Sequence, residues 1–369
     1  MSHFPHTELS TRHLLIRPFL DSDVDDIVAS CSDRTARHFL RLPDPYTADD
    51  ARVFIDKARR KWESGSAEWV IADPETNRYL GGIGLADVDR GRGSAEIGYV
   101  TAPWARGRGV AAEATIAVTD YLFANRIERS ELRVVPENIP SQRVAIRAGY
   151  QKDGLLRSAA VGEQWRSDYL VYSRLPTDPP PPAPRYLPDL PSGRLTDGVV
   201  ALDPFTPDDT DEYFALSALP EVWGTSMPPI PPDRAAIEQL CNHGAQMAWL
   251  AGQAARMAIR DAETGKLAGA MGVYRQGGPL PQVMLGYSLA REFRGRGFMS
   301  RAVGLAVDWS FDIVGAKRVV AGTASDNAAS QAVLARAGFV KEGLERDRLL
   351  APGGGFVDNV MWSILPKDR

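Results

Sequence analysis

The two halves of this chain repeat one another, and this repeat constrains the fold more than any other feature of the sequence. Three blocks of the first half recur in the same order in the second half, two of them 188 positions later and the third 189 positions later. The pairs are DPET at 73–76 with DAET at 261–264, GY to RGRG at 98–109 with 286–297, and NIPSQ at 138–142 with NAASQ at 327–331. Matches in one order and register predict two copies of one domain.

A proline-rich segment separates the copies. Residues 176–191 read PTDPPPPAPRYLPDLP, in which every second position on average lacks a backbone donor. Such a segment cannot form a helix or a central strand, and it is typical of a stiff spacer. The sequence therefore predicts an N-terminal domain at 1–175, a linker at 176–191 and a C-terminal domain at 192–369.

Each half is expected to contain a strand, two helices, a meander of three strands and then alternating helices and strands. In the first half, apolar periodicity and capping signals predict helices from Ser22, after the Thr47 cap, and at 110–125 and 141–148. The expected strands are at 69–72, 80–86, 96–100 and 132–135. This order predicts an α/β fold with a mixed sheet.

Charge and cysteine content exclude several classes of protein. The formal net charge of −4 argues against a general nucleic-acid binder, which needs a basic face to displace counterions from phosphates. Cys31 and Cys241 are too few and too far apart for a disulfide framework or a four-ligand zinc site, and the five histidines have no metal-binding spacing. With neither a leader nor an apolar run of membrane length, we expect a soluble cytoplasmic protein without a metal.

The arginine and glycine bend at 106–111, RGRGVA, lies between a predicted strand and a predicted helix. Glycine allows a turn to bring backbone N–H groups close to an anion, and the following helix directs its free N–H groups to the same place. The alternative is a solvated basic loop, but the bend recurs at 294–297. A nucleotide-hydrolase phosphate loop is excluded because no Gly-Lys-Ser/Thr follows the glycines.

With these motifs the sequence resembles the GNAT superfamily of N-acetyltransferases, in its RimJ/RimL-like branch, over most of both halves. The family's diphosphate pattern, Gln/Arg-x-x-Gly-x-Gly/Ala, is met by Arg106, Gly109 and Ala111. The second copy departs from the pattern at its last place, Met299. The resemblance implies two tandem GNAT domains that bind acetyl-CoA, with its pantetheine arm between two splayed strands. The implied cofactor-binding residues are Tyr99, Val100, Thr101, Arg106, Gly107, Arg108, Gly109, Val110, Ala111 and Asn138, and Tyr287, Ser288, Leu289, Arg294, Gly295, Arg296, Gly297, Phe298, Met299 and Asn327.

The implied reaction is attack of a neutral amine on a thioester, which needs a base for the ammonium group and gains from an acid for the thiolate. Glu96 is the candidate base by its place in the family's strand, and the alternative is an exposed strand carboxylate. Its counterpart in the second half is Met284, so that half needs another base or performs no chemistry.

Ser141 and Ser330 match a family serine that is proposed to protonate the thiolate. Many relatives use a tyrosine later in this helix instead, but Ala145 and Leu334 occupy those positions, which leaves the serine as the acid. The alternative is that Asn138 and the serine form a helix N-cap. Near the end of each half, Asp168 and Asp358 are expected just before the last strand, where a turn or structural role is favoured over a place in the substrate cleft.

The resemblance implies acetyl or short-acyl transfer to a primary amine of a small molecule or of a protein N-terminus. The alternative is an acyl-CoA-binding sensor or scaffold with one or both copies inactive. The resemblance also implies a pseudo-dimer within the chain and leaves a homo-oligomer open, with neither nucleic acid nor membrane as a partner.

Overall fold

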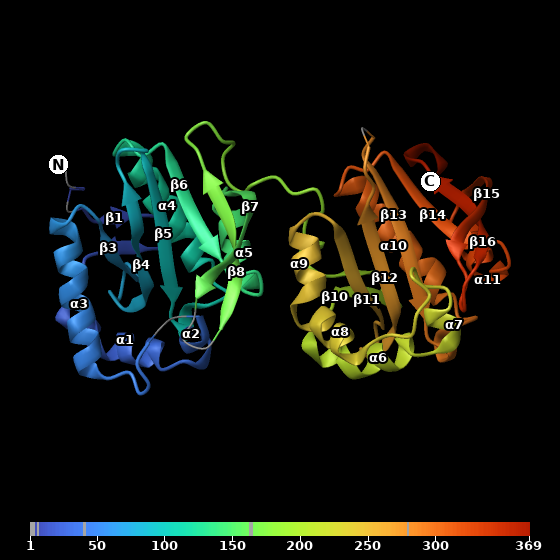
Figure 1. Cartoon of the computed structure of the whole chain (residues 1–369), viewed down its shortest axis with the longest axis horizontal. Helices are drawn as coiled ribbons and strands as arrows, with labels where there is room; N and C mark the ends of the chain where they lie inside the picture. The colour runs from blue at the N-terminus through green and yellow to red at the C-terminus, as the bar shows by residue number, and fades with distance from the viewer. Residues whose placement is uncertain (1–3, 6, 40–41, 162–164, 279) are drawn as a thin grey trace. The chain divides into compact units, whose positions relative to one another are not determined.

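The computed structural model describes residues 4–5, 7–39, 42–161, 165–278 and 280–369. The chain divides into two compact units, Met1–Pro184 and Arg185–Arg369. Within the described residues, each unit is built on one mixed sheet of eight strands (Figure 1). The sequence prediction of two tandem domains with mixed α/β sheets is therefore confirmed.

The sheet of the first unit has the strand order β1-β2-β3-β4-β5-β6-β8-β7. Neighbouring strands are antiparallel, except that β5 and β6 run parallel. The elements are β1 (Leu9–Ser10), β2 (Leu15–Arg17), α1 (Val24–Cys31), α2 (Arg34–Phe39), α3 (Ala48–Glu63), β3 (Glu68–Ala72), β4 (Tyr79–Asp89), β5 (Ser94–Thr101), α4 (Val110–Ala124), β6 (Arg129–Val134), α5 (Ile139–Arg147), β7 (Gln151–Val161) and β8 (Arg166–Arg174).

The second unit repeats this plan in the order β15-β16-β14-β13-β12-β11-β10-β9, with β13 and β14 as its parallel pair. A π-helical turn, Leu240–Gly244, joins α8 to α9. The elements are β9 (Leu195–Thr196), β10 (Val200–Pro204), α6 (Thr210–Ser217), α7 (Pro220–Trp223), α8 (Arg234–Gln239), α9 (Ala245–Leu250), β11 (Ala254–Asp261), β12 (Leu267–Arg275), β13 (Gln282–Leu289), α10 (Phe298–Asp312), β14 (Arg318–Ala324), α11 (Ala328–Arg336), β15 (Val340–Leu350) and β16 (Phe356–Ile364).

Local signals in the sequence account for most of the element boundaries. The Thr47 side chain accepts a hydrogen bond from the Asp50 N–H, and the Asp50 carboxylate accepts one from the Thr47 N–H, so a capping box begins α3 as expected. Helix α4 starts at Val110, directly after the glycine bend. The expected helices and strands are present, with ends displaced by a few residues.

The expected position of Asp168 and Asp358 before the last strand is wrong, because both lie inside it, in β8 and β16. The Asp168 carboxylate accepts a hydrogen bond from the Ser158 N–H at 2.7 Å, and Asp358 accepts one from Asp347 at 2.9 Å. Ser158 and Asp347 have positive φ at an irregularity in the hairpin register. The aspartates therefore hold a bulge, and the strand continues past it.

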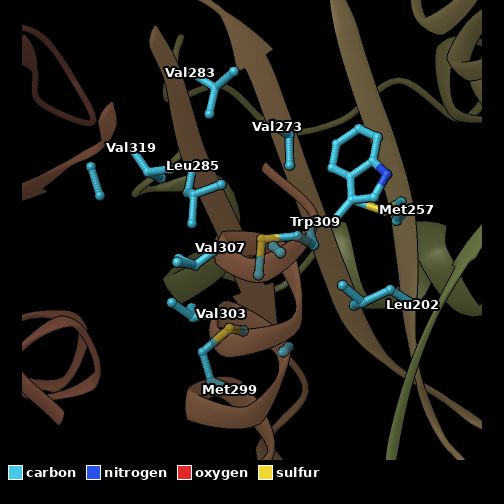
Figure 2. Close-up of a cluster of buried hydrophobic side chains, with 14 of the residues drawn as sticks. Leu202, Met257, Val273, Val283, Leu285, Met299, Val303, Val307, Trp309 and Val319 are labelled. Atoms are coloured by element: carbon cyan, nitrogen blue, oxygen red, sulfur yellow. The ribbon is translucent and has the colours of Figure 1, made fainter. Parts of the chain in front are cut away.

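The core of the second unit lies between α10 and one face of the sheet. Figure 2 shows Trp309 of α10 beside Met257, in one cluster with Val303 and Val307 of the helix and strand residues such as Leu285. Trp309 is 2 % exposed, and burial of such a side chain contributes about 1.5–3 kcal/mol.

The proline-rich segment packs onto the units it joins. The Ala183 N–H donates to the Ile146 carbonyl of the first unit. Leu187 and Leu190 are buried in the core of the second unit, where the Trp249 indole donates to the Pro188 carbonyl at 3.0 Å.

Candidate active site

A gap between two parallel strands is the feature that the two units share at their centre. In the described chain, β5 pairs with β6 only from Ser94 to Glu96 and then continues to Thr101 along β4. In the second unit, β13 pairs with β14 only from Gln282 to Leu285. Beyond these points one edge of each strand is left unpaired by its parallel neighbour, so an extended ligand can add to it as a further strand. The predicted cofactor residues on these edges are Tyr99, Val100, Thr101, Tyr287, Ser288 and Leu289.

The two glycine bends have the same backbone conformation. Gly107 and Gly109 have φ of 74° and 80°, and Gly295 and Gly297 have φ of 73° and 78°. Gly109 and Gly297 are the N-caps of α4 and α10, and no described side chain caps either helix. The first N–H groups of both helices are therefore available to an anion, and the bends fit the diphosphate of a coenzyme.

The other predicted residues of the bends are of two kinds, arginines that form charged contacts and apolar residues that pack in the core. Arg106 donates to Asp33 at 2.6 Å and holds the pKa of this carboxyl below its usual range, whereas Arg294 donates to the Leu289 carbonyl. Backbone hydrogen bonds from Thr76 and Thr264 lower the pKa of Asp73 and of Asp261, and the positive charges of Arg108 and Arg296 add a smaller effect of the same sign. The residues that follow each bend are buried in the core: Val110, Ala111, Phe298 and Met299.

Met299, the departure from the family pattern, is thus a packing difference. Its side chain is 6 % exposed and belongs to the core cluster of the second unit. The backbone of the bend beside it is unchanged.

Glu96 lies at the vertex of the gap, because its pair with Glu131 is the last pair between β5 and β6. Its side chain is 19 % exposed, and its Oε2 lies 3.3 Å from the Arg133 guanidinium. Burial raises the pKa of Glu96, Arg133 opposes this shift, and the carboxylates of Glu131 and Asp87 add to it. The sequence did not predict that Asp87, Glu131 and Arg133 surround Glu96. Alternation of side chains along β4 and β6 places them on the same face of the sheet as Glu96.

The candidate serines lie on the opposite face of the sheet. Asn138 accepts a hydrogen bond from the Ser141 N–H at 3.2 Å, and Asn327 accepts one from the Ser330 N–H at 3.0 Å. The capping interpretation is therefore confirmed, and it leaves the serine hydroxyls free to take other partners.

A tyrosine from the gap strand reaches each serine. The Tyr287 hydroxyl lies 2.9 Å from the Ser330 Oγ, and the Tyr99 hydroxyl donates to the Ser141 carbonyl at 3.4 Å. Burial raises the pKa of both phenols, so they stay protonated at neutral pH. Sequence reasoning gave these tyrosines a role through their backbone only. The strand period could have shown that Tyr99, three positions after Glu96, faces the other side.

The family model described as an acetyltransferase (GNAT) domain matches this chain twice, at residues 13–151 and 200–340. The chain belongs to the GNAT acetyltransferase family. It is an acetyl-CoA-dependent N-acetyltransferase, with two GNAT domains in tandem.

Three similar GNAT proteins each cover slightly less than half of this chain. The uncharacterized N-acetyltransferase p20 of Bacillus licheniformis is 31% identical over 170 residues, which are 45% of this chain and 95% of that protein. The structure of Mycobacterium smegmatis RimJ in complex with CoA-disulfide covers 47% of this chain and 86% of its own, with 22% identity and a TM-score of 0.41. Spermidine N-acetyltransferase from Vibrio cholerae, in complex with CoA and spermine, covers 47% and 98%, with 18% identity and a TM-score of 0.41.

The two GNAT copies differ at the vertex of the gap. By strand register, the second copy replaces all four charged groups of the first around this point. The replacements are Tyr274 for Asp87, Met284 for Glu96, Val320 for Glu131 and Gly322 for Arg133. The gap and the glycine bend are shared, whereas the charged groups at the vertex are not.

Two further properties of this GNAT chain concern the described residues alone. No three histidine, cysteine, aspartate or glutamate side chains among them form a group that could hold a metal ion. None of their helices combines the length and the apolar character needed to cross a bilayer.

Proposed function

We propose that the first half of the chain transfers an acetyl group, or another short acyl group, from coenzyme A to a primary amine of a small molecule or a protein N-terminus, with Glu96 as the general base. The observation that carries this proposal is the position of Glu96, half-buried beside Arg133 where β5 and β6 separate. A carboxylate at this vertex faces the space in which a thioester and an amine can meet.

Acetyl-CoA, when bound, supplies the thioester carbonyl carbon that the amine attacks. The bends at Gly109 and Gly297 are suited to hold its diphosphate by backbone N–H groups, and the free edges of β5 and β13 are suited to pair with its amide-containing arm. Both halves therefore contribute a coenzyme site to the proposal.

Glu96 accepts the proton that the acceptor ammonium must lose. An α-amine has a pKa near about 8, so a base of raised pKa is better matched to it than an ordinary carboxylate. Arg133 favours the ionised carboxylate, because its positive charge opposes the rise in pKa that burial causes.

On the other face, the Ser141 hydroxyl gives a proton to the sulfur when the carbon–sulfur bond breaks, after the carbon–nitrogen bond has formed. Tyr99 lies against the same helix turn and supports this end of the gap. Ser330 and Tyr287 form the corresponding pair in the second half. Base and acid thus serve the amine and the thiolate from opposite faces of one sheet.

The proposal is tested by incubating the purified chain with acetyl-CoA and a panel of amines and N-terminal peptides, and by following release of the free thiol. For an accepted amine, Glu96→Gln is expected to lower kcat by about 10²–10⁴-fold. Glu96→Asp, which keeps the charge and shortens the side chain, is expected to retain part of the rate. Thiol release that needs no amine, or equal rates for wild type and Glu96→Gln, would contradict the assignment.

Binding without transfer is the outcome that favours a different function. If the chain binds acetyl-CoA and acetylates no member of a broad panel, an acyl-CoA sensor or scaffold accounts better for the two sites.

A further inference from the structure

A pair of glycines lies next to the vertex of each gap, on the face of the sheet that carries Glu96 in the first half. Gly84 of β4 is the register partner of Gly98 of β5, and Gly272 of β12 is the partner of Gly286 of β13. Gly98 and Gly286 are two positions beyond Glu96 and Met284, so they share a face with them. An acceptor that enters from this face passes over these glycines to reach the gap.

In the first half, no described side chain covers the glycine of the gap strand, Gly98 of β5. A Cβ placed on Gly84 would meet the Glu68 side chain at 2.8 Å, so Glu68 lies on that glycine. A Cβ placed on Gly98 would have no described atom closer than the Ala86 Cβ at 4.0 Å, apart from its chain neighbours. Gly98 is therefore exposed and not covered by a neighbouring side chain, and Glu96 and Glu68 lie on the same face beside it.

In the second half an aromatic ring lies over both glycines. A Cβ placed on Gly272 would meet the Tyr274 ring at 2.5 Å, and one placed on Gly286 would meet the same ring at 3.4 Å. The contact at Gly272 is possible only because this residue lacks a side chain, whereas at Gly286 the ring would lie at van der Waals distance from a Cβ. The ring thus extends from its own strand, β12, onto the gap strand, β13.

Neighbouring residues hold the ring in this position. The guanidinium of Arg256, which occupies the place of Glu68, lies 5.8 Å from the centre of the Tyr274 ring. An arginine at this distance attracts the face of an aromatic ring. Met284 is the register partner of Tyr274 across the strand pair, and its flexible apolar side chain suits a ring edge.

We propose that Tyr274 closes the acceptor side of the second half, so that this half binds acyl-CoA without transferring the acyl group, while the first half, with Gly98 uncovered, performs the reaction. This inference rests on the proposed function and adds to it a residue that determines which copy admits an acceptor. Loss of the base at Met284 alone would slow transfer from an ammonium; the ring also excludes an amine that is already neutral.

The experiment separates the halves in the full chain. Gly109→Val removes coenzyme binding from the first half, because a β-branched residue does not adopt the φ of 80° found there. Tyr274→Ala and Tyr274→Phe are then added to this background. Transfer is measured at pH 9 with an α-amine acceptor, which is largely neutral above its pKa of about 8 and needs no base.

The Gly109→Val chain is expected to transfer almost no acyl group. Adding Tyr274→Ala is expected to raise the rate of transfer about tenfold or more, whereas adding Tyr274→Phe, which keeps the ring, is expected to leave the rate unchanged. Calorimetry with acetyl-CoA on the same proteins shows whether the second site is still occupied. Rapid transfer by Gly109→Val with Tyr274 intact would overturn the proposal, as would no gain with Tyr274→Ala while acetyl-CoA still binds. Failure of the proposed function is distinct, because the wild-type chain would then transfer nothing.

Discussion

At the scale of single residues, the two copies of this GNAT chain differ in a few side chains around one point of the sheet. Glu96 is surrounded by Arg133 and two other carboxylates, whereas Met284 has Tyr274 and Val320 as strand neighbours. The sequence could predict the first contrast, glutamate against methionine, because the repeat aligns these positions. It could not predict the surrounding groups, since these are brought together by pairing between strands far apart in the chain.

The charge of Arg133 sets the pH dependence of the base. Because the base acts in its ionised form, transfer falls as the pH drops through the pKa of Glu96, which burial raises. In Arg133→Met the carboxylate loses its cation, its pKa rises further, and the acid limb of the kcat/KM profile moves to higher pH. Arg143→Met, on α5 and not among the charges that shift the pKa of Glu96, serves as a charge control. An acid limb that stays in place in Arg133→Met would contradict the role given to this pair.

At the scale of elements, the glycine bends and the helices they begin are the features that the sequence predicts best. The bends need positive φ at Gly107 and Gly109, and they are followed at once by an apolar helix, so both signals are local. The gap is less local, because it depends on where β5 and β6 stop pairing. The tyrosine contact at Ser330 was not foreseen for the same reason: it joins residues 43 positions apart.

Substitutions at Gly109 can separate the effect of its backbone conformation from the effect of adding a side chain. A Cβ on Gly109 would meet no described atom within 4 Å, so the strain of a substitution there comes from φ alone. Gly109→Val is expected to cost about 1–2 kcal/mol and to lose acetyl-CoA binding at the first site. Asparagine enters the left-handed region more readily, so Gly109→Asn is expected to lose much less stability and much less acetyl-CoA affinity. Chemical denaturation and calorimetry measure the two effects, and equal losses in the two variants would count against this explanation.

At the scale of the whole molecule, each unit has its own sheet and its own buried core. The repeat predicted this duplication well. The boundary is harder to read from sequence, because proline content indicates where helices and strands cannot form but not where leucines are buried. Leu187 and Leu190 fall in the segment predicted as a linker, yet they pack into the second core.

The boundary can be tested with two fragments. A fragment of residues 185–369 keeps both leucines and the Pro188 carbonyl that accepts from Trp249, whereas a fragment of residues 192–369 loses them. Loss of one buried leucine side chain typically costs roughly 2–5 kcal/mol, so the shorter fragment is expected to unfold at a clearly lower urea concentration. Equal midpoints for the two fragments would show that the segment adds nothing to the second core.

The most direct test of the central claim is to count the acetyl-CoA molecules that one chain binds. Calorimetric titration is expected to give two per chain for the wild type, and one each for Gly109→Val and Gly297→Val, because each substitution disables one bend. A wild-type chain that binds none, or a stoichiometry that neither substitution changes, would contradict the assignment of both sites.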